Sequence, residues 1–310
     1  MTAQAAKYVG TSVPRKEDAA LLTGAACFVS DISLAGMLHA AVLRSVHAHA
    51  RINRVDLSAA RALAGVTAAF DGEALRGQFP EISLMAGPTV DVRSFPERVL
   101  AYDKVRYAGE PVAVVVAESR RVAEDALDLI EVEYEPLPAV VELDQALASA
   151  APLVHEQLGS NLAGQQTQTV GDLEKAFQEA AHVLQERVTV HRGAGHALET
   201  RAVLASYEKK TGALTVWATS QGVHRLQRAL CSMLRLPEHR VRVITPFVGG
   251  GFGPKGGTDP ELTLVSWLAM QLDRPVKWVE DRREHCVAAK QERDQIHDAA
   301  IAFDHSGRIL

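Results

Sequence analysis

The residues from Val248 to Gly257 constrain the fold most, because six of these ten positions are glycine. Glycine costs backbone entropy, so such a run persists mainly where the backbone takes a positive φ or approaches another group closely. The run follows the strand-like Val241 to Ile244 and precedes the helix-like Glu261 to Leu272. A glycine loop between a strand and a helix offers free amide groups and a positive helix end, which suit an anion. We therefore expect a site for a phosphorylated cofactor.

This glycine loop departs from the common nucleotide-binding loops. A P-loop needs Ser or Thr after its lysine, whereas Gly256 follows Lys255. Counted from Gly249, the dinucleotide fingerprint would require its third glycine where Pro254 stands. A flexible linker is the plain alternative, but linkers seldom carry a large aromatic residue such as Phe252. The pattern favours a binding loop of another kind.

Bulk composition limits the class of protein. A chain of 310 residues exceeds the usual single-domain size, so two domains are expected. With 47% apolar and 23% charged residues it is typical of a soluble globular protein, and a net charge of −5 gives no general attraction for nucleic acid or anionic lipid. We expect a small-molecule ligand and no nucleic-acid partner.

Cysteine usage and the absence of long apolar segments predict the cellular compartment of the protein. Cys27, Cys231 and Cys286 are odd in number and far apart, so neither a disulfide framework nor a clustered iron–sulfur or zinc motif is expected. No apolar run approaches the roughly 20 residues needed to cross a bilayer, and the segment from Met1 to Lys7 lacks the plan of a signal peptide. A cytoplasmic protein without a membrane partner is expected.

The first segment is expected to contain short elements before a boundary at residues 136 to 171. Strands are predicted at 25–29, 37–43, 66–70, 111–117 and 130–134, with helices capped by Ser58 and Ser119. The last two strands and the helix between them are expected to form a β–α–β unit, and residues 71 to 100 an irregular excursion. His47 and His49 lie close together without a third ligand nearby, so no metal site is assigned.

The second segment is expected to alternate strands and helices. Strands are predicted at 182–190, 203–207, 214–218, 241–244 and 276–279, with helices after Asp172, after Gly222 and from about Glu261. Thr258 and Glu261 could form a capping box, or Asp259 could cap the helix with Pro260 in its first turn. The charged run from Glu280 to Glu284 is expected on solvated surface.

Several side chains of this segment are candidates for a site. Glu199 and Arg201, in a loop of small residues, could line a site or form an ion pair. Gln221 and the glycine loop both follow strands, which is the usual place for ligand contacts in α/β layers. The residues from 301 to 310 read as a strand, a turn and a returning strand, so we expect residues outside the chain to pair with it.

Ordered motifs along the chain resemble the molybdenum-binding subunit of the xanthine dehydrogenase and aldehyde oxidase family. They are Gly36 to Ala40, Arg44 to Ile52, Val105 to Ala113, Trp217 to Gly222 and Gly249 to Lys255. The resemblance implies an α+β fold: an α/β hammerhead domain over residues 1–150, followed over 160–310 by the first part of a molybdopterin-binding α/β domain that a partner chain completes.

The resemblance implies a role for particular residues. Gln221 would lie near the molybdenum oxo ligand, and Gly250, Gly251, Phe252 and Gly253 would contact the cofactor. Phe252 and Glu199 would line the substrate pocket, with no side chain ligating the metal directly. The general base of the family, a glutamate, would lie beyond residue 310, so no catalytic residue is assigned here and activity is expected to need a partner.

The resemblance also implies a reaction and partners. The family hydroxylates carbon with oxygen from water, using molybdopterin, in bacteria usually as the cytosine dinucleotide. Electrons leave through iron–sulfur clusters to FAD on partner subunits. The expected partners are a second molybdopterin-binding chain, an iron–sulfur subunit and an FAD subunit. An N-heteroaromatic substrate is favoured; the alternatives are an aldehyde, carbon monoxide or a non-enzymatic truncated homologue. A purine is disfavoured because Gly256 replaces the acidic residue after Lys255.

Overall fold

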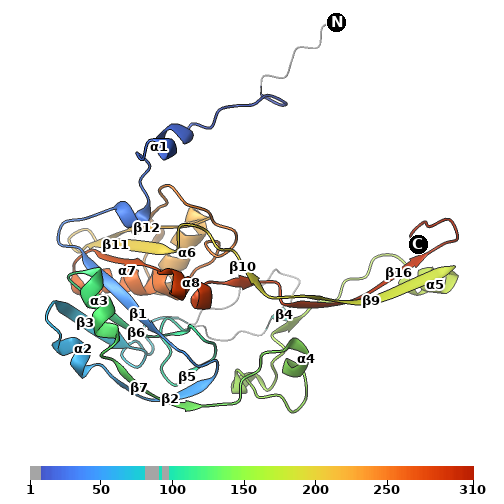
Figure 1. Cartoon of the computed structure of the whole chain (residues 1–310), viewed down its shortest axis with the longest axis horizontal. Helices are drawn as coiled ribbons and strands as arrows, with labels where there is room; N and C mark the ends of the chain where they lie inside the picture. The colour runs from blue at the N-terminus through green and yellow to red at the C-terminus, as the bar shows by residue number, and fades with distance from the viewer. Residues whose placement is uncertain (1–7, 81–90, 93–97) are drawn as a thin grey trace, which may run out of the picture.

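The computed structural model describes residues 8–80, 91–92 and 98–310 (Figure 1). Its helices are α1 (Asp18–Leu22), α2 (Ser58–Ala62), α3 (Arg120–Leu127), α4 (Leu143–Ala146), α5 (Leu173–Glu179), α6 (Val223–Leu234), α7 (Pro260–Leu272) and α8 (Arg282–Ala288). Its strands are β1 (Leu38–Arg44), β2 (Ala50–Asp56), β3 (Val66–Asp71), β4 (Asp91–Val92), β5 (Lys104–Val105), β6 (Pro111–Ala117), β7 (Glu131–Pro136), β8 (Gly164–Gln165), β9 (His182–Val190), β10 (Gly193–Ala194), β11 (Ala202–Glu208), β12 (Ala213–Ala218), β13 (Val241–Ile244), β14 (Val276–Val279), β15 (Gln291–Glu292) and β16 (Gln295–Phe303). The predicted features at residues 1–7 and over much of 71–100 lie outside the described residues.

A mixed sheet of seven strands runs through the body in the order β13-β12-β11-β14-β1-β6-β3. Strand β1 pairs in parallel with β14 and antiparallel with β6. Because β1 belongs to the first segment and β14 to the second, one sheet continues through both predicted domains. The fold is α+β, as expected, while the domain limits at 1–150 and 160–310 stay a prediction.

The hydrophobic core anchors the helix that follows the glycine loop. Every residue of β6 is buried, as its valine-rich run predicted. Helix α7 is apolar on most of its circumference, and Leu264, Val265 and Leu268 are fully buried. A helix that is apolar nearly all round must be covered on several sides. It packs against β11, β14 and α6, so its N-terminus, where the glycine loop ends, is anchored in the core.

The predicted β–α–β unit is wrong in its pairing. Both elements flanking α3 exist, but β6 is already paired on its two edges by β1 and β3. Strand β7 instead pairs with β2 in a separate sheet of order β5-β2-β7. Its alternating burial is typical of a strand with one covered face, whereas β6 is covered on both.

Local interactions explain where sequence prediction of the elements succeeds and fails. Ser119 and Asp172 cap α3 and α5 as predicted, each accepting a hydrogen bond from a backbone amide. Ser58 is the first residue of α2 rather than its cap. The predicted strand at 25–29 is absent from the described residues, because Asp31 accepts a hydrogen bond from the Phe28 amide and closes a 3-10 turn.

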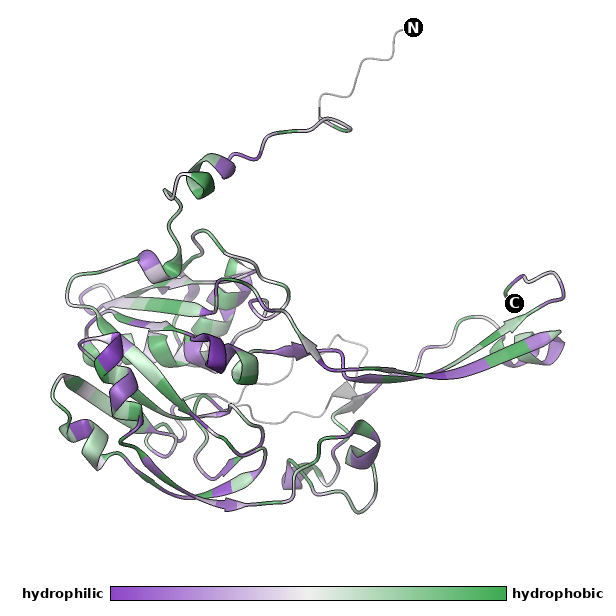
Figure 2. Cartoon of the chain, viewed as in Figure 1, coloured by the Kyte–Doolittle hydropathy of each residue, from purple (hydrophilic) through white to green (hydrophobic). Residues whose placement is uncertain are grey.

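A long two-stranded ribbon of β9 and β16 extends away from the body (Figure 1). Leu184 pairs with Ile301 and Val188 pairs with His297, so these side chains share one face. Leu184 is 53% exposed and Val188 is 49% exposed. Apolar stretches are visible on the outer part of the ribbon in Figure 2. Beyond β16, a bridge between Phe303 and Ile309 confirms the predicted returning turn.

Burial raises the pKa of Glu110 to about 7, although the Arg106 amide and guanidinium act in the opposite direction. Its unfolded-state value is near 4.5, so the folded protein holds this proton more tightly. The stabilisation is fully present below about pH 4.5 and is lost as the pH rises through about 7. We expect stability to fall by roughly 3 kcal/mol across this window from Glu110 alone.

Urea unfolding at several pH values, with wild type compared with Glu110→Gln, tests this expectation. The variant should lose the decline between about pH 4.5 and 7, because an amide does not titrate. Glu118→Gln, which changes an exposed carboxyl on the neighbouring segment, should keep it. Parallel stability curves for wild type and Glu110→Gln would contradict the assignment.

Candidate functional site

The glycine loop takes the backbone conformations that its composition predicted. Gly250 and Gly253 have φ angles of 99° and 102°, a region that favours glycine. Phe252 also has a positive φ, 55°, which is uncommon for a bulky residue and stores strain. A Cβ on Gly251 would lie 2.6 Å from Gln221 Cδ, so this glycine permits close approach. The structure therefore brings Gln221 directly against the loop.

Glu199 and Lys255 form an ion pair, here called the clamp, that holds the glycine loop in place. Glu199 Oε2 accepts a hydrogen bond from the Gly249 amide at 2.7 Å and another from Lys255 Nζ at 2.7 Å. Burial lowers the pKa of Lys255, and the Glu199 carboxylate opposes that change. Glu199 and Arg201 do not pair with each other, as one of the two predicted alternatives had it: Glu199 pairs with Lys255, and Arg201 pairs with Glu280 and Glu261. The contacts of Glu199 with Gly249 and Lys255 hold both ends of the glycine turn. Glu199 Oε1 is buried and has no hydrogen-bond partner within the described residues.

Gln221 reaches the loop from the end of β12. Its backbone amide donates to the Lys255 carbonyl at 2.9 Å, and its Oε1 accepts from the Gly253 amide at 3.0 Å. This contact sets the orientation of the side-chain amide, because the oxygen must face the donor. The Nε2 group then has no acceptor in the described part of the chain and remains available to donate to a ligand oxygen.

Free donors and an exposed aromatic ring meet at this place. Among the described residues, the amides of Gly250, Gly251 and Phe252 donate to no protein acceptor. The Phe252 side chain is 68% exposed, and nothing lies within 4 Å of a Cβ placed on Gly253. A cofactor rich in oxygen atoms fits such donors, and a flat ligand could stack on the ring. The predicted residues Gln221, Gly250, Gly251, Phe252, Gly253 and Glu199 are thus brought together.

A buried ion-pair network supports the site from the core. Arg201 Nη2 donates to Glu280 Oε1 at 2.5 Å, and its Nη1 lies 3.3 Å from Glu261 Oε2. Arg44 Nη2 contacts the other Glu261 oxygen at 2.7 Å. Burial alone would lower the pKa of Arg201, but Glu261, Asp259 and Glu280 together raise it well above its usual value. The network ties β1 to the start of α7.

This network decides between the two predicted starts of α7 and corrects part of a second prediction. Glu261 forms no capping box with Thr258, because its carboxylate is taken by the two arginines; Asp259 is the cap residue, with Pro260 following it. The run from Glu280 to Glu284 is only partly on the surface: Arg282 and Arg283 are exposed, as predicted, but Glu280 is 2% exposed. A signal was present: Asp281 and Glu284 form a capping box, which predicts a helix that begins at Arg282.

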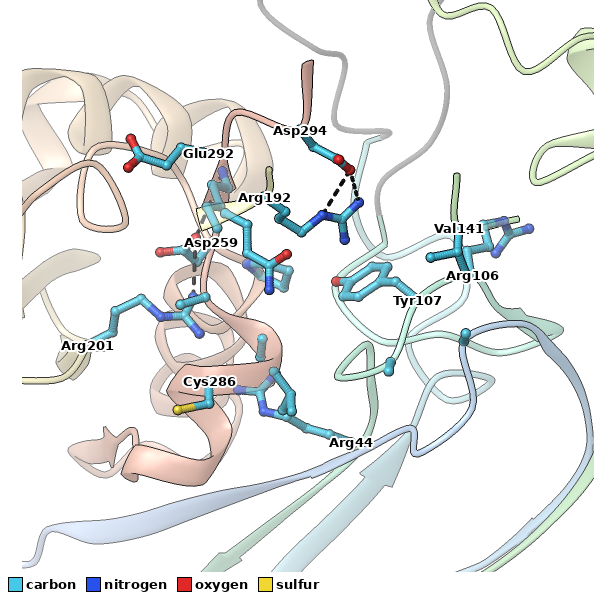
Figure 3. Close-up of a pocket in the computed structure, with 18 of the residues that line it drawn as sticks. Arg44, Arg106, Tyr107, Val141, Arg192, Arg201, Asp259, Cys286, Glu292 and Asp294 are labelled. Carbon is cyan, nitrogen blue, oxygen red and sulfur yellow. Dashed lines mark hydrogen bonds and ion pairs between the residues drawn. The ribbon is translucent and has the colours of Figure 1, made fainter. Parts of the chain in front are cut away.

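A cavity of about 690 Å³ lies beyond the end of the glycine loop, between the two segments (Figure 3). Arg106 and Tyr107 line it from the first segment, and Cys286 and Arg192 from the second. Arg192 pairs with Asp294 across its wall at 2.8 Å. Of the predicted candidates, Arg201 lines this cavity, whereas Glu199, Gln221 and residues 250–253 do not, so the cavity is separate from the convergence at Phe252.

Neither a metal centre nor a membrane-spanning helix is found in the described part of the chain. The described residues contain no group of three or more His, Cys, Asp or Glu side chains arranged to hold a metal ion. His49 is buried and lies 2.7 Å, through Nδ1, from the Pro138 carbonyl. None of the helices in the described ranges has the length and apolar character required to span a bilayer.

Comparison with known families matches both parts of the chain. Residues 154–310 match the molybdopterin cofactor-binding domain, and residues 23–138 match the α/β hammerhead domain of aldehyde oxidase and xanthine dehydrogenase. The gamma subunit of the 6-hydroxypseudooxynicotine dehydrogenase complex of Paenarthrobacter nicotinovorans is 37% identical over 306 residues, which cover 98% of this chain and 38% of that protein.

Solved structures show the same arrangement. Quinoline 2-oxidoreductase from Pseudomonas putida 86 superimposes with a TM-score of 0.91 at 38% identity, covering 97% of this chain and 38% of that one. The carbon monoxide dehydrogenase from Oligotropha carboxidovorans superimposes with a TM-score of 0.87 at 35% identity, again over 97% and 38%. The chain therefore spans less than two fifths of the length of each of these proteins.

Proposed function

Because the chain belongs to the xanthine dehydrogenase and aldehyde oxidase family of molybdenum hydroxylases, we propose that it is a component of a multi-subunit enzyme that hydroxylates carbon with oxygen from water. The observation that carries the proposal is the convergence of unpaired donors at one exposed ring: the amides of Gly250, Gly251 and Phe252 beside Gln221 Nε2. A molybdenum–pterin cofactor, with cytosine dinucleotide as the favoured form, presents oxygen atoms that such donors bind.

The residues of the candidate site have separate parts in the proposed reaction. Bound here, the cofactor would supply the two-electron oxidation. Gln221 donates from Nε2 to an oxygen of the cofactor, and the loop amides hold it in place. The Glu199 and Lys255 pair keeps the loop rigid, so that the donors are preorganised. The proton-accepting glutamate is proposed to come from a second molybdopterin-binding chain, so this chain alone is expected to be inactive.

The proposed substrate is an N-heteroaromatic ring. The exposed face of Phe252 favours a flat ligand, because aromatic rings stack with offset or edge contacts. The similarity to quinoline 2-oxidoreductase supports the same class. Glu199 Oε1, buried and without a partner in the described chain, would accept a hydrogen bond from a ring nitrogen in its protonated form. Carbon monoxide is the second candidate, supported by the similarity to carbon monoxide dehydrogenase.

The proposed partners are the second molybdopterin-binding chain, an iron–sulfur subunit and an FAD subunit, assembled in the cytoplasm. The ribbon supports an assembly, because Leu184, Val188 and Ile301 present one apolar face to solvent. Exposed apolar surface of this kind marks protein contacts.

Purification from the native host, with molybdenum and pterin quantified and co-purifying polypeptides identified, tests the proposal. We expect stoichiometric molybdenum, a partner chain, and oxidation of quinoline with an artificial electron acceptor. Turnover of carbon monoxide or an aldehyde, without turnover of quinoline, would change the substrate class. A metal-free chain without a partner would contradict the proposed enzymatic function and favour the alternative of a non-enzymatic homologue.

A further inference from the structure

Phe252 depends on another loop for its position. A Cβ on Gly195 would lie 2.6 Å from both Phe252 Cβ and Phe252 O, so the two backbones are in direct contact. On the other side, a Cβ on Gly250 would lie 3.1 Å from Ala197 Cβ and 2.7 Å from the Phe252 ring. Because Phe252 holds a strained positive φ, surrounding contacts must fix it. Gly195 contacts Phe252 directly, and Ala197 lies against the neighbouring Gly250.

Two side chains of helix α8 hold the segment from Gly195 to Leu198 by contacting its backbone carbonyl groups. Arg282 Nη2 donates to the carbonyls of Ala197 at 2.7 Å and Leu198 at 2.9 Å. His285 Nε2 lies 3.1 Å from the Gly195 carbonyl oxygen. The two side chains are three residues apart on one helix, so they project from the same face.

His285 is itself fixed from the core. Its ring is 1% exposed, and its Nδ1 lies 2.9 Å from Glu280 Oε2. Glu280 also accepts bonds from the amide and the guanidinium of Arg201, so its carboxylate has a single orientation. A continuous set of contacts therefore leads from the buried network through α8 to the support of Phe252.

We infer that Arg282 and His285 are positioning residues that hold the 195–198 segment and, through it, set the place of the Phe252 ring against an aromatic substrate. Neither touches the predicted cofactor site. The inference about substrate rests on the proposed function, whereas the positioning of Phe252 rests on geometry alone. The side chain of the neighbouring Arg283 is exposed and makes no hydrogen bond or ion pair within the described residues, which provides a matched control.

Hydrogen exchange on the complete enzyme complex measures the positioning without turnover. The variants are Arg282→Met, His285→Gln and Gly195→Ala, with Arg283→Met as control. We expect amide exchange over residues 193–199 and 248–254 to rise about fivefold or more in the first three variants and to be unchanged in the control. Exchange unchanged in both segments for folded Arg282→Met would overturn the inference. If His285→Gln fails to fold, the exchange measured for Arg282→Met tests the inference by itself.

Kinetics with quinoline and its smaller analogue pyridine provide the second readout. Loss of stacking order should raise KM for quinoline about three- to tenfold in Arg282→Met, with a much smaller change in kcat and an unchanged molybdenum content. A merely structural role would lower kcat and cofactor content together. Failure of the proposed function would appear separately, as wild-type enzyme without molybdenum or turnover, and would leave the exchange result intact.

Discussion

Replacing Arg201 with methionine is expected to lower the free energy of unfolding by about 3–5 kcal/mol. The side chain of Arg201 is 4% exposed and lies between the carboxylates of Glu280 and Glu261, which are fully or almost fully buried. Without the guanidinium these two charges would lack their main partner in a region closed to water. Urea unfolding followed by circular dichroism measures the loss.

The control for this change is Arg187→Met. Arg187 of the ribbon pairs with Asp298 of the same ribbon and with Asp144 of α4, and its side chain is 50% exposed. Exposed pairs are worth little, so the variant should stay within about 1 kcal/mol of wild type. The double variant Arg201→Met with Glu280→Gln should recover part of the loss, because one unpaired charge is removed. Equal destabilisation by the two arginine variants would mean that the network does not anchor the core.

Replacing Lys255 with methionine is expected to reduce the molybdenum retained by the purified complex about tenfold or more, because groups that orient a binding site are typically worth 10- to 100-fold. Lys255 Nζ and the Gly249 amide share one oxygen of Glu199. Removal of the cation leaves the Glu199 carboxylate, 14% exposed, without its ion pair. The glycine loop would then lose its fixed place. Elemental analysis of molybdenum and quinoline turnover measure the effect.

A double-mutant cycle separates lost charge balance from lost shape. Lys255→Met combined with Glu199→Gln removes both charges, and it should retain more molybdenum than Lys255→Met alone. Lys210→Met changes an exposed lysine on the β11–β12 connection and should retain the wild-type content. Wild-type molybdenum in Lys255→Met would refute the clamp, and a double variant as poor as the single one would exclude charge imbalance as the cause.

The two buried charge systems explain why mutation effects should differ so strongly across the chain. Arg44 and Arg201 both reach Glu261 at the first turn of α7, so the strand of one segment is coupled to the helix of the other. Surface pairs such as Arg120 with Glu124 on α3 join neighbours on one helix only. Loss of a long-range buried ion pair leaves an unpaired charge in the core, whereas water solvates the charge that remains after loss of a local surface pair.

The sequence by itself determined the features that depend on neighbours along the chain. The valine run of β6, the caps at Ser119 and Asp172, and the glycines that take positive φ at 250 and 253 act over a few residues, and the structure confirms them. The resemblance to the family was also readable, because the spacing of its motifs is a property of the sequence.

Only the tertiary structure decided which distant groups meet. Glu199 is 56 residues from Lys255, and Arg44 is 217 residues from Glu261. The charged run from Glu280 to Glu284 looks like surface from its composition, yet its first residue, Glu280, is buried and accepts hydrogen bonds from Arg201 and His285. Local patterns record backbone preference and periodicity, while ion pairing in the core depends on strand order, which places β14 beside β1 and β11. That order brings together the Glu199–Lys255 pair at the glycine loop and helix α8 at the 195–198 segment, and no short stretch of sequence contains it.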